Sequence, residues 1–111
     1  MTPAPPALSL AHALPDLVAD LESPLAHLGR GDLVGQLRAA SIASWTYDDF
    51  ADATTIVLLP GAEPAELLSL YDEAGVNLDT DVEGRLCRIE VLGGRRVASL
   101  LQLLLPPSPP G

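Results

Sequence analysis

Apolar residues at three- and four-residue spacing predict two helices in the first part of the chain. The first helical stripe consists of Leu14, Leu17, Val18, Leu21, Leu25 and Leu28. Pro15 suits the first turn of this helix, whereas Pro24 falls inside it and predicts either a kink or a new start capped by Ser23. Asp32 is expected to cap a second helix over residues 33–40.

From residue 41 onward the helical spacing gives way to alternation, which predicts strands. Residues 41–48 alternate, and residues 53–59 are β-branched and apolar, so the two segments are expected to form a hairpin. Residues 65–74 are predicted to form a short helix that Gly75 ends. A second hairpin is expected from the strand candidates at 76–81 and 85–92, followed by a helix over 95–105.

This order of elements predicts an α+β fold, in which a small antiparallel sheet of two hairpins, about four strands, is covered by the N- and C-terminal helices. We expect a flexible leader over 1–13, a single domain over 14–105 and a disordered proline-rich tail over 106–111. The leader has no positively charged segment and its apolar run is broken by prolines, so it does not resemble a secretion signal. A cytoplasmic location is therefore expected.

The charge of the chain narrows the classes of partner. Its 111 residues carry a formal net charge of -9, and the six basic residues are all arginine. Proteins that bind nucleic acids need basic side chains to neutralise phosphates, and anionic membranes repel acidic proteins. The composition therefore predicts no nucleic-acid partner and no membrane partner, whereas a basic protein partner is electrostatically favourable.

One motif raises the question of calcium. Residues 79–90, "DTDVEGRLCRIE", fit the loop of an EF-hand at every position but Glu83. An EF-hand also needs a helix on each side of the loop. Gly75 would interrupt the entering helix, and Gly93 and Gly94 would break the exiting one. We therefore interpret the motif as a β-hairpin in which Gly84 takes a positive φ.

Acidic residues gather at both predicted hairpin turns, and in a β-meander we expect these turns to share one end of the sheet. The candidate acidic rim consists of Asp48, Asp49, Asp52, Asp79, Asp81 and Glu83. Such residues often build turns, but the rim could also hold a weakly bound cation or dock a basic partner. Cys87 is interpreted as a core residue, and His12 and His27 are scattered. We predict no catalytic residue, cofactor or metal.

Both hairpins carry a family resemblance over residues 44–94. "YDDFADATTIVLL" and "VNLDTDVEGRLCRIEVLGG" resemble the DUF2283 family. The matching residues are Tyr47, Asp48, Asp52, Ile56, Leu58, Asp79, Asp81, Gly84, Arg85, Leu86, Cys87, Ile89, Glu90, Val91 and Leu92. The family has no established activity, so the resemblance implies a fold rather than a chemistry. Some members are encoded beside toxin-like proteins, which implies an antitoxin-like role as one option.

These observations favour a non-enzymatic protein that works by self-association or by binding another protein. The stripe from Leu14 to Leu28 and the run "LLQLLL" at 100–105 offer more apolar surface than a small sheet can cover, which predicts a homodimer. The alternative is a weak cation-binding or catalytic protein that uses the acidic rim.

Overall fold

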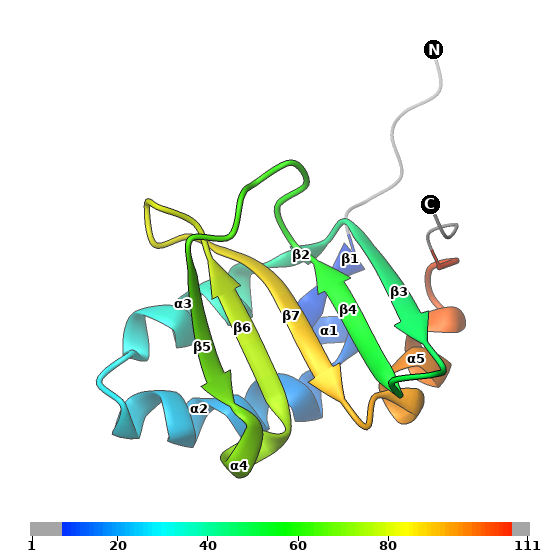
Figure 1. The fold of residues 1–111 in the computed structure, drawn as a ribbon, viewed down its shortest axis with the longest axis horizontal. Helices are drawn as coiled ribbons and strands as arrows, with labels where there is room; N and C mark the ends of the chain where they lie inside the picture. Colours follow the sequence, from blue (N-terminus) through cyan, green and yellow to red (C-terminus); the bar gives the residue numbers. More distant parts are fainter. Residues whose placement is uncertain (1–7, 108–111) are drawn as a thin grey trace.

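The computed structural model describes residues 8–107, which fold around a five-stranded antiparallel sheet of order β3-β4-β7-β6-β5 (Figure 1). A separate two-stranded sheet pairs β1 with β2. In chain order the elements are β1 (Leu8–Ser9), α1 (Leu10–Ala13), α2 (Pro15–His27), α3 (Gly31–Ala39), β2 (Ser41–Ile42), β3 (Ser44–Asp48), β4 (Ala53–Val57), β5 (Glu66–Leu70), α4 (Tyr71–Ala74), β6 (Val76–Thr80), β7 (Leu86–Leu92) and α5 (Arg95–Gln102). The predicted α+β class is confirmed, but the sheet has one strand more than expected.

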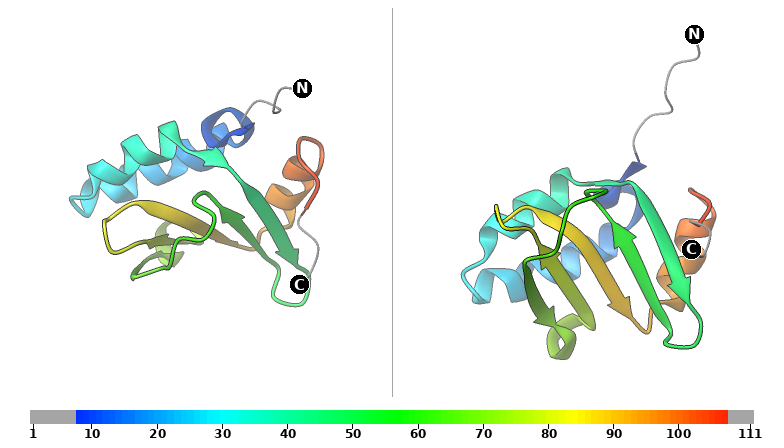
Figure 2. Two further views of the ribbon diagram at one scale, coloured as in Figure 1. Left: turned by 90° about the horizontal axis from the view of Figure 1, so that it is seen from above. Right: turned by 45° about the horizontal axis from the view of Figure 1, so that its top comes forward.

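The helices α1, α2, α3 and α5 lie on one face of the five-stranded sheet and leave the other face bare (Figure 2). Strand alternation sends every second side chain toward the helices. One row of facing residues crosses all five strands on the helix side: Trp45, Ile56, Ile89, Leu78 and Leu68. Its first four members are buried, and they form the centre of the core.

The bare face has the opposite composition. Its two cross-strand rows consist of Thr46, Thr55, Glu90, Asn77 and Ser69, and of Ser44, Val57, Arg88, Asp79 and Leu67. Polar side chains predominate in both rows, as expected for a sheet with one solvated face. The alternation along β4, β6 and β7 therefore determines which face the helices cover.

The predicted helix over 65–74 is wrong for most of its length. Residues 66–70 form strand β5, which pairs with β6 in regular register, and only 71–74 form a helical turn. Leucine and glutamate favour helices in isolation, but the ladder to β6 overrides this weak preference. As a strand, the segment adds Leu70 to the core, where it is fully buried.

The N-terminal helices also differ in detail from the prediction. Helix α2 continues through Pro24, and its Leu21 and Leu25 are fully buried. Asp32 does not cap α3, because Arg30 occupies the N-cap position and Asp32 lies in the first turn. The two side chains are paired, with 3.3 Å between Arg30 Nε and Asp32 Oδ1.

The predicted boundary between leader and domain requires correction. Residues 8–13, which we assigned to the leader, form β1 and α1, and Leu10 is fully buried. Strand β1 pairs with β2. The sequence pattern had predicted β2 and β3 as one continuous strand over residues 41–48. The rest of the predicted leader, 1–7, and residues 108–111 of the predicted tail lie outside the described residues.

Candidate functional site

The two acidic turns lie at opposite ends of the sheet, so the predicted single acidic rim does not form. In the ladder between β4 and β7, Ala53 pairs with Leu92 and Val57 pairs with Arg88. The turn at 49–52 therefore adjoins the end of β7, whereas the turn at 81–85 adjoins its start (Figure 1). The prediction assumed a simple meander, but β7 separates β4 from β6 in the sheet.

In the first turn the acids hold the backbone of the turn itself. Asp48 Oδ1 accepts hydrogen bonds from the backbone N–H groups of Phe50 and Ala51, at 3.0 and 3.2 Å. Asp52 adopts a φ of 49°, and its carboxylate accepts a 2.6 Å hydrogen bond from the Tyr47 hydroxyl. Asp49 is exposed. Two of the three acids in this turn thus have structural partners, as expected of aspartate in turns.

In the second turn a single buried carboxylate organises the chain. Asp81 accepts hydrogen bonds from the backbone N–H groups of Glu83 and Arg85 and from the Arg85 guanidinium, at 3.0, 2.9 and 2.8 Å. These bonds, led by that of the Arg85 N–H, lower the pKa of Asp81 against the opposing effect of desolvation. Asp81 therefore stays ionised, and its charge is balanced inside the turn.

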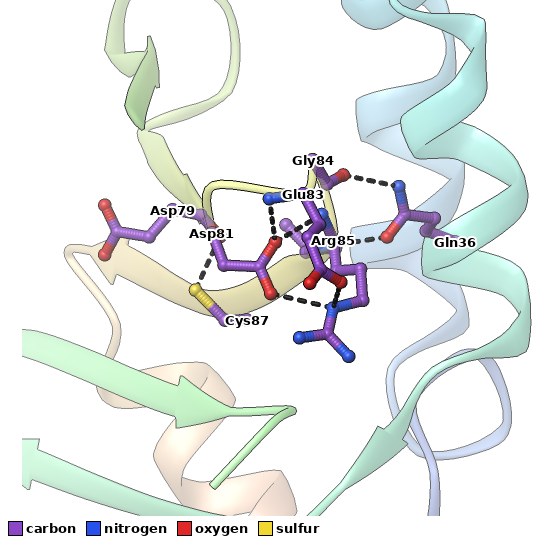
Figure 3. A network of polar contacts seen from close by, with 8 residues as sticks. Gln36, Asp79, Asp81, Glu83, Gly84, Arg85 and Cys87 are labelled. Atoms are coloured by element: carbon purple, nitrogen blue, oxygen red, sulfur yellow. Dashed lines mark hydrogen bonds and ion pairs between the residues drawn. The ribbon is translucent and has the colours of Figure 1, made fainter. Parts of the chain in front are cut away.

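Helix α3 holds this second turn in place. The Gln36 amide donates to the Gly84 carbonyl at 3.0 Å and accepts from the Leu86 N–H at 2.7 Å, and Figure 3 shows the side chain reaching across from the helix. One side chain thus satisfies two backbone groups at the start of β7. The role of Gln36 was not predicted from the sequence, because nothing in the local pattern of a helix shows which turn a polar side chain will contact.

The EF-hand-like motif folds as the predicted hairpin. Gly84 has a φ of 80°, as predicted, and Asp79 pairs with Arg88 through a 2.9 Å contact between Oδ2 and Nε. In Figure 3 the carboxylate of Asp79 points away from that of Asp81. Glu90 lies on β7 and accepts a 3.3 Å hydrogen bond from the Asn77 amide. Within residues 8–107, no group of three or more His, Cys, Asp or Glu side chains could hold a metal ion.

Cys87 is buried beside a register shift in the ladder between β6 and β7. Its thiol donates a hydrogen bond to the Asp79 carbonyl at 3.2 Å. Desolvation, followed by the nearby negative charge of Asp79, raises the pKa of Cys87, which keeps the thiol protonated. His12 and His27 lie exposed on α1 and α2. This arrangement does not activate Cys87 as a nucleophile.

The bare face of the sheet contains a shallow hollow of about 330 Å³, which the sequence analysis did not identify. It is lined by Thr55, Leu67, Asn77, Asp79, Arg88 and Glu90. The alternating polar residues of β6 and β7 were a visible signal for it. The charged side chains that line the hollow already have partners within it, because Asp79 forms an ion pair with Arg88 and Glu90 accepts a hydrogen bond from Asn77.

The two apolar segments behind the dimer prediction differ in exposure. In the α2 stripe, Leu14, Val18, Leu21 and Leu25 are buried within the protein, and only Leu28 is mostly exposed. At the C-terminal helix, Leu100, Leu103 and Leu104 remain 47%, 83% and 52% exposed. A groove of about 460 Å³ runs between this surface and the start of α2, with Leu17, Val97 and Leu100 among its lining residues.

No helix in the described part of the chain is both long and apolar enough to cross a membrane.

No curated protein and no solved structure matches the chain. The segment that contains the two hairpins does match a family model. Residues 45–93, which take in the five-stranded sheet from Trp45 to the end of β7, match the model of the family described as "Protein of unknown function (DUF2283)", in agreement with the resemblance of the two hairpins.

Proposed function

We propose that this protein is a non-enzymatic interaction module that self-associates through α5 and the groove beside it. The observation that carries the proposal is the apolar surface formed by Leu100, Leu103 and Leu104, each about half exposed or more. Val97 extends this surface by one helical turn, because residues three apart share a helix face. Contiguous apolar patches of this kind commonly mark interaction sites.

The charges around the groove are self-complementary. Asp16 and Asp20 border it on α2, and Arg96 borders it on α5. Within residues 8–107 none of the three takes part in an ion pair. In a two-fold dimer every contact occurs twice, so Arg96 of each copy can face Asp16 or Asp20 of the other. This complementarity favours a second copy as the occupant.

Several observations support a role in association rather than catalysis. The acidic turns lie apart, and the negative charge of Asp81 is balanced by Arg85 within the same turn. Burial keeps the Cys87 thiol protonated. The lone cysteine, which calls for no oxidising compartment, is consistent with a cytoplasmic location. An antitoxin-like role, which the family resemblance implies, would be one use of such a module.

Sedimentation at micromolar concentration tests this proposal. We expect the wild type to sediment as a dimer of the 11.6 kDa chain and Leu100→Glu to sediment as a monomer, because a buried unpaired carboxylate opposes association. Leu28→Glu is the matched control, since Leu28 is 52% exposed and lies outside the groove, and it should remain dimeric. A monomeric wild type, or a dimer that Leu100→Glu leaves intact, contradicts the proposal.

A further inference from the structure

Strand β5 forms one edge of the five-stranded sheet, and beyond the charged Glu66 at its first position it has none of the usual protection of an edge (Figure 1). Natural edge strands are commonly protected by lysine, proline or a bulge. Residues 66–70, "ELLSL", contain no lysine, arginine or proline, and their register with β6 has no shift. Apart from the ladder to β6, the backbone of 66–69 makes no hydrogen bond to another described residue.

The opposite edge, β3, has a neighbour. Helix α5 packs against β3 and β4, and the Trp45 indole donates a 2.8 Å hydrogen bond to the Leu105 carbonyl. The segment after α5 is thereby tied to β3 (Figure 1). Among the described residues, β5 has one bond of this kind, at its first residue, where the Arg30 guanidinium donates to Glu66 at 3.1 Å. Because no helix within residues 8–107 packs closely against β5, its edge has less around it than the β3 edge.

The side chains of β5 offer apolar contacts on both faces of a strand added beside it. Leu67 is 61% exposed on the bare face, where it also lines the hollow. Leu68 is half-buried on the helix face. An added strand projects its own side chains alternately to the two faces, so it would meet one of these leucines on each side.

The charge around β5 indicates what kind of strand would fit. Residues 60–75 contain four acidic residues and no basic one. Glu66 has a partner in Arg30, at 3.1 Å, whereas Glu63 and Asp72 are exposed and form no ion pair with a described residue. A second copy paired here would bring two acidic segments together, and like charges across strands are destabilising. A basic segment would be attracted instead.

We propose that the β5 edge docks an extended, basic segment of another protein, which adds a sixth strand to the sheet. The main chain of the segment would bond to the outward groups of β5, and lysine or arginine residues flanking it would lie near Glu63 and Asp72. This site is separate from the α5 surface of the proposed dimer. One protein could therefore hold its own copy and a second protein at the same time.

Backbone amide spectra of the full chain test this inference. The probe is a short peptide of alternating threonine and valine flanked by lysines, and the matched peptide carries glutamates instead. We expect the lysine peptide to shift the amides of residues 65–70 and to bind more weakly as salt rises, because exposed charge attraction is screened over about 8–10 Å. The glutamate peptide should bind at least about tenfold more weakly.

Two variants make the assignment specific to this edge. Leu67→Lys places a charge beside the docked strand and should weaken binding at least about fivefold. Thr46→Lys adds the same charge at the exposed position of β3 and should change binding less than about twofold. Leu100→Glu should leave peptide binding intact, so failure of the dimer proposal would not be mistaken for failure of this one.

Four results would overturn the inference. These are no amide shift with the lysine peptide, shifts that map to β3, equal binding of the two peptides, and equal effects of Leu67→Lys and Thr46→Lys. Shifts at 66–70 that depend on protein concentration without any peptide would identify a second copy as the occupant.

Discussion

The turns at 48–52 and 81–85 have similar acidic composition but are attached to the rest of the protein in different ways. The first is held by its own short contacts and by one backbone bond, in which the Gly94 N–H donates to the Asp52 carbonyl at 3.0 Å. The second is held by a buried carboxylate, Asp81, and by Gln36 from helix α3.

The difference shows that the contribution of an acidic turn residue to stability depends on which element packs against the turn. A turn beside a helix can bury a carboxylate if backbone N–H groups satisfy it, as they do for Asp81. A turn that projects into solvent keeps its carboxylates hydrated, and replacing one should cost less. Substitutions in and around the two turns are therefore expected to differ in their effect on stability.

The largest effect is expected at Gly94, which holds the first turn. A Cβ at this position would lie 2.6 Å from the Val91 carbonyl oxygen and 2.7 Å from Thr54 Oγ1. Gly94→Ala should therefore lower the free energy of unfolding in urea by about 3 kcal/mol or more. Gly35→Ala is the control, because a Cβ there meets nothing within 4 Å, and it should stabilise α3 by about 0.5–1 kcal/mol. Equal free energies of unfolding for the two variants would contradict this expectation, because they would mean that the backbone around Gly94 can shift to make room for the added Cβ.

The next effect compares the two turns directly. Asp81→Ala leaves the backbone N–H groups of Glu83 and Arg85 without their acceptor, and should lower the Tm by roughly 5–10 °C. Asp48→Ala also removes two hydrogen bonds, but in an exposed turn, and should lower the Tm by less than about 3 °C. Equal losses in thermal melts would remove the distinction between the turns.

The pH dependence of the same variants provides a second readout. The pKa of Asp81 is lower in the folded protein than in the unfolded chain, so its contribution is complete above the unfolded value of about 3.9. That contribution is lost as the pH falls through the lower, folded value. The gap in Tm between wild type and Asp81→Ala should therefore be widest near neutral pH and close in strong acid. A gap that widens on acidification would contradict this assignment.

The smallest effect is expected from calcium. Because residues 79–90 form a hairpin and Glu90 hydrogen-bonds to Asn77, millimolar calcium should leave the Tm unchanged in wild type and in Glu90→Gln. Thermal melts with calcium and with chelator measure this. An upward shift in wild type that Glu90→Gln abolishes would show that the second turn binds the ion after all.

Strong local signals were sufficient to predict much of the sheet. Alternation predicted β3, and β-branched apolar residues predicted β4. Strands β6 and β7 were expected on either side of the Glu83–Gly84 turn, in which Gly84 takes a positive φ. The helix after Gly94 was also predicted, although it ends at Gln102 and not at residue 105. In each case neighbouring residues carry enough information to fix the backbone conformation.

The remaining features depend on distant parts of the chain. Strand β5 is a strand because β6 lies beside it, and Leu10 is buried because the end of the predicted leader packs with the other helices. The prediction of a single acidic rim was wrong because the local pattern of residues does not determine the order of strands in the sheet, where β7 lies between β4 and β6. The contacts of Gln36 join residues about 50 positions apart, beyond the reach of any local pattern.

The strand order also has a consequence for synthesis on the ribosome. Strand β4 ends at Val57, but its second neighbour, β7, begins at Leu86, about 30 residues later. At about 5–20 residues per second, one edge of β4 stays unpaired in the nascent chain for about 1.5–6 s. The earlier helices can form meanwhile and shield the apolar side of the hairpin, because local structure precedes long-range pairing. Cotranslational folding would then proceed from the first helices to the sheet, which the arrival of β7 completes, and α5 would pack against β3 and β4 last.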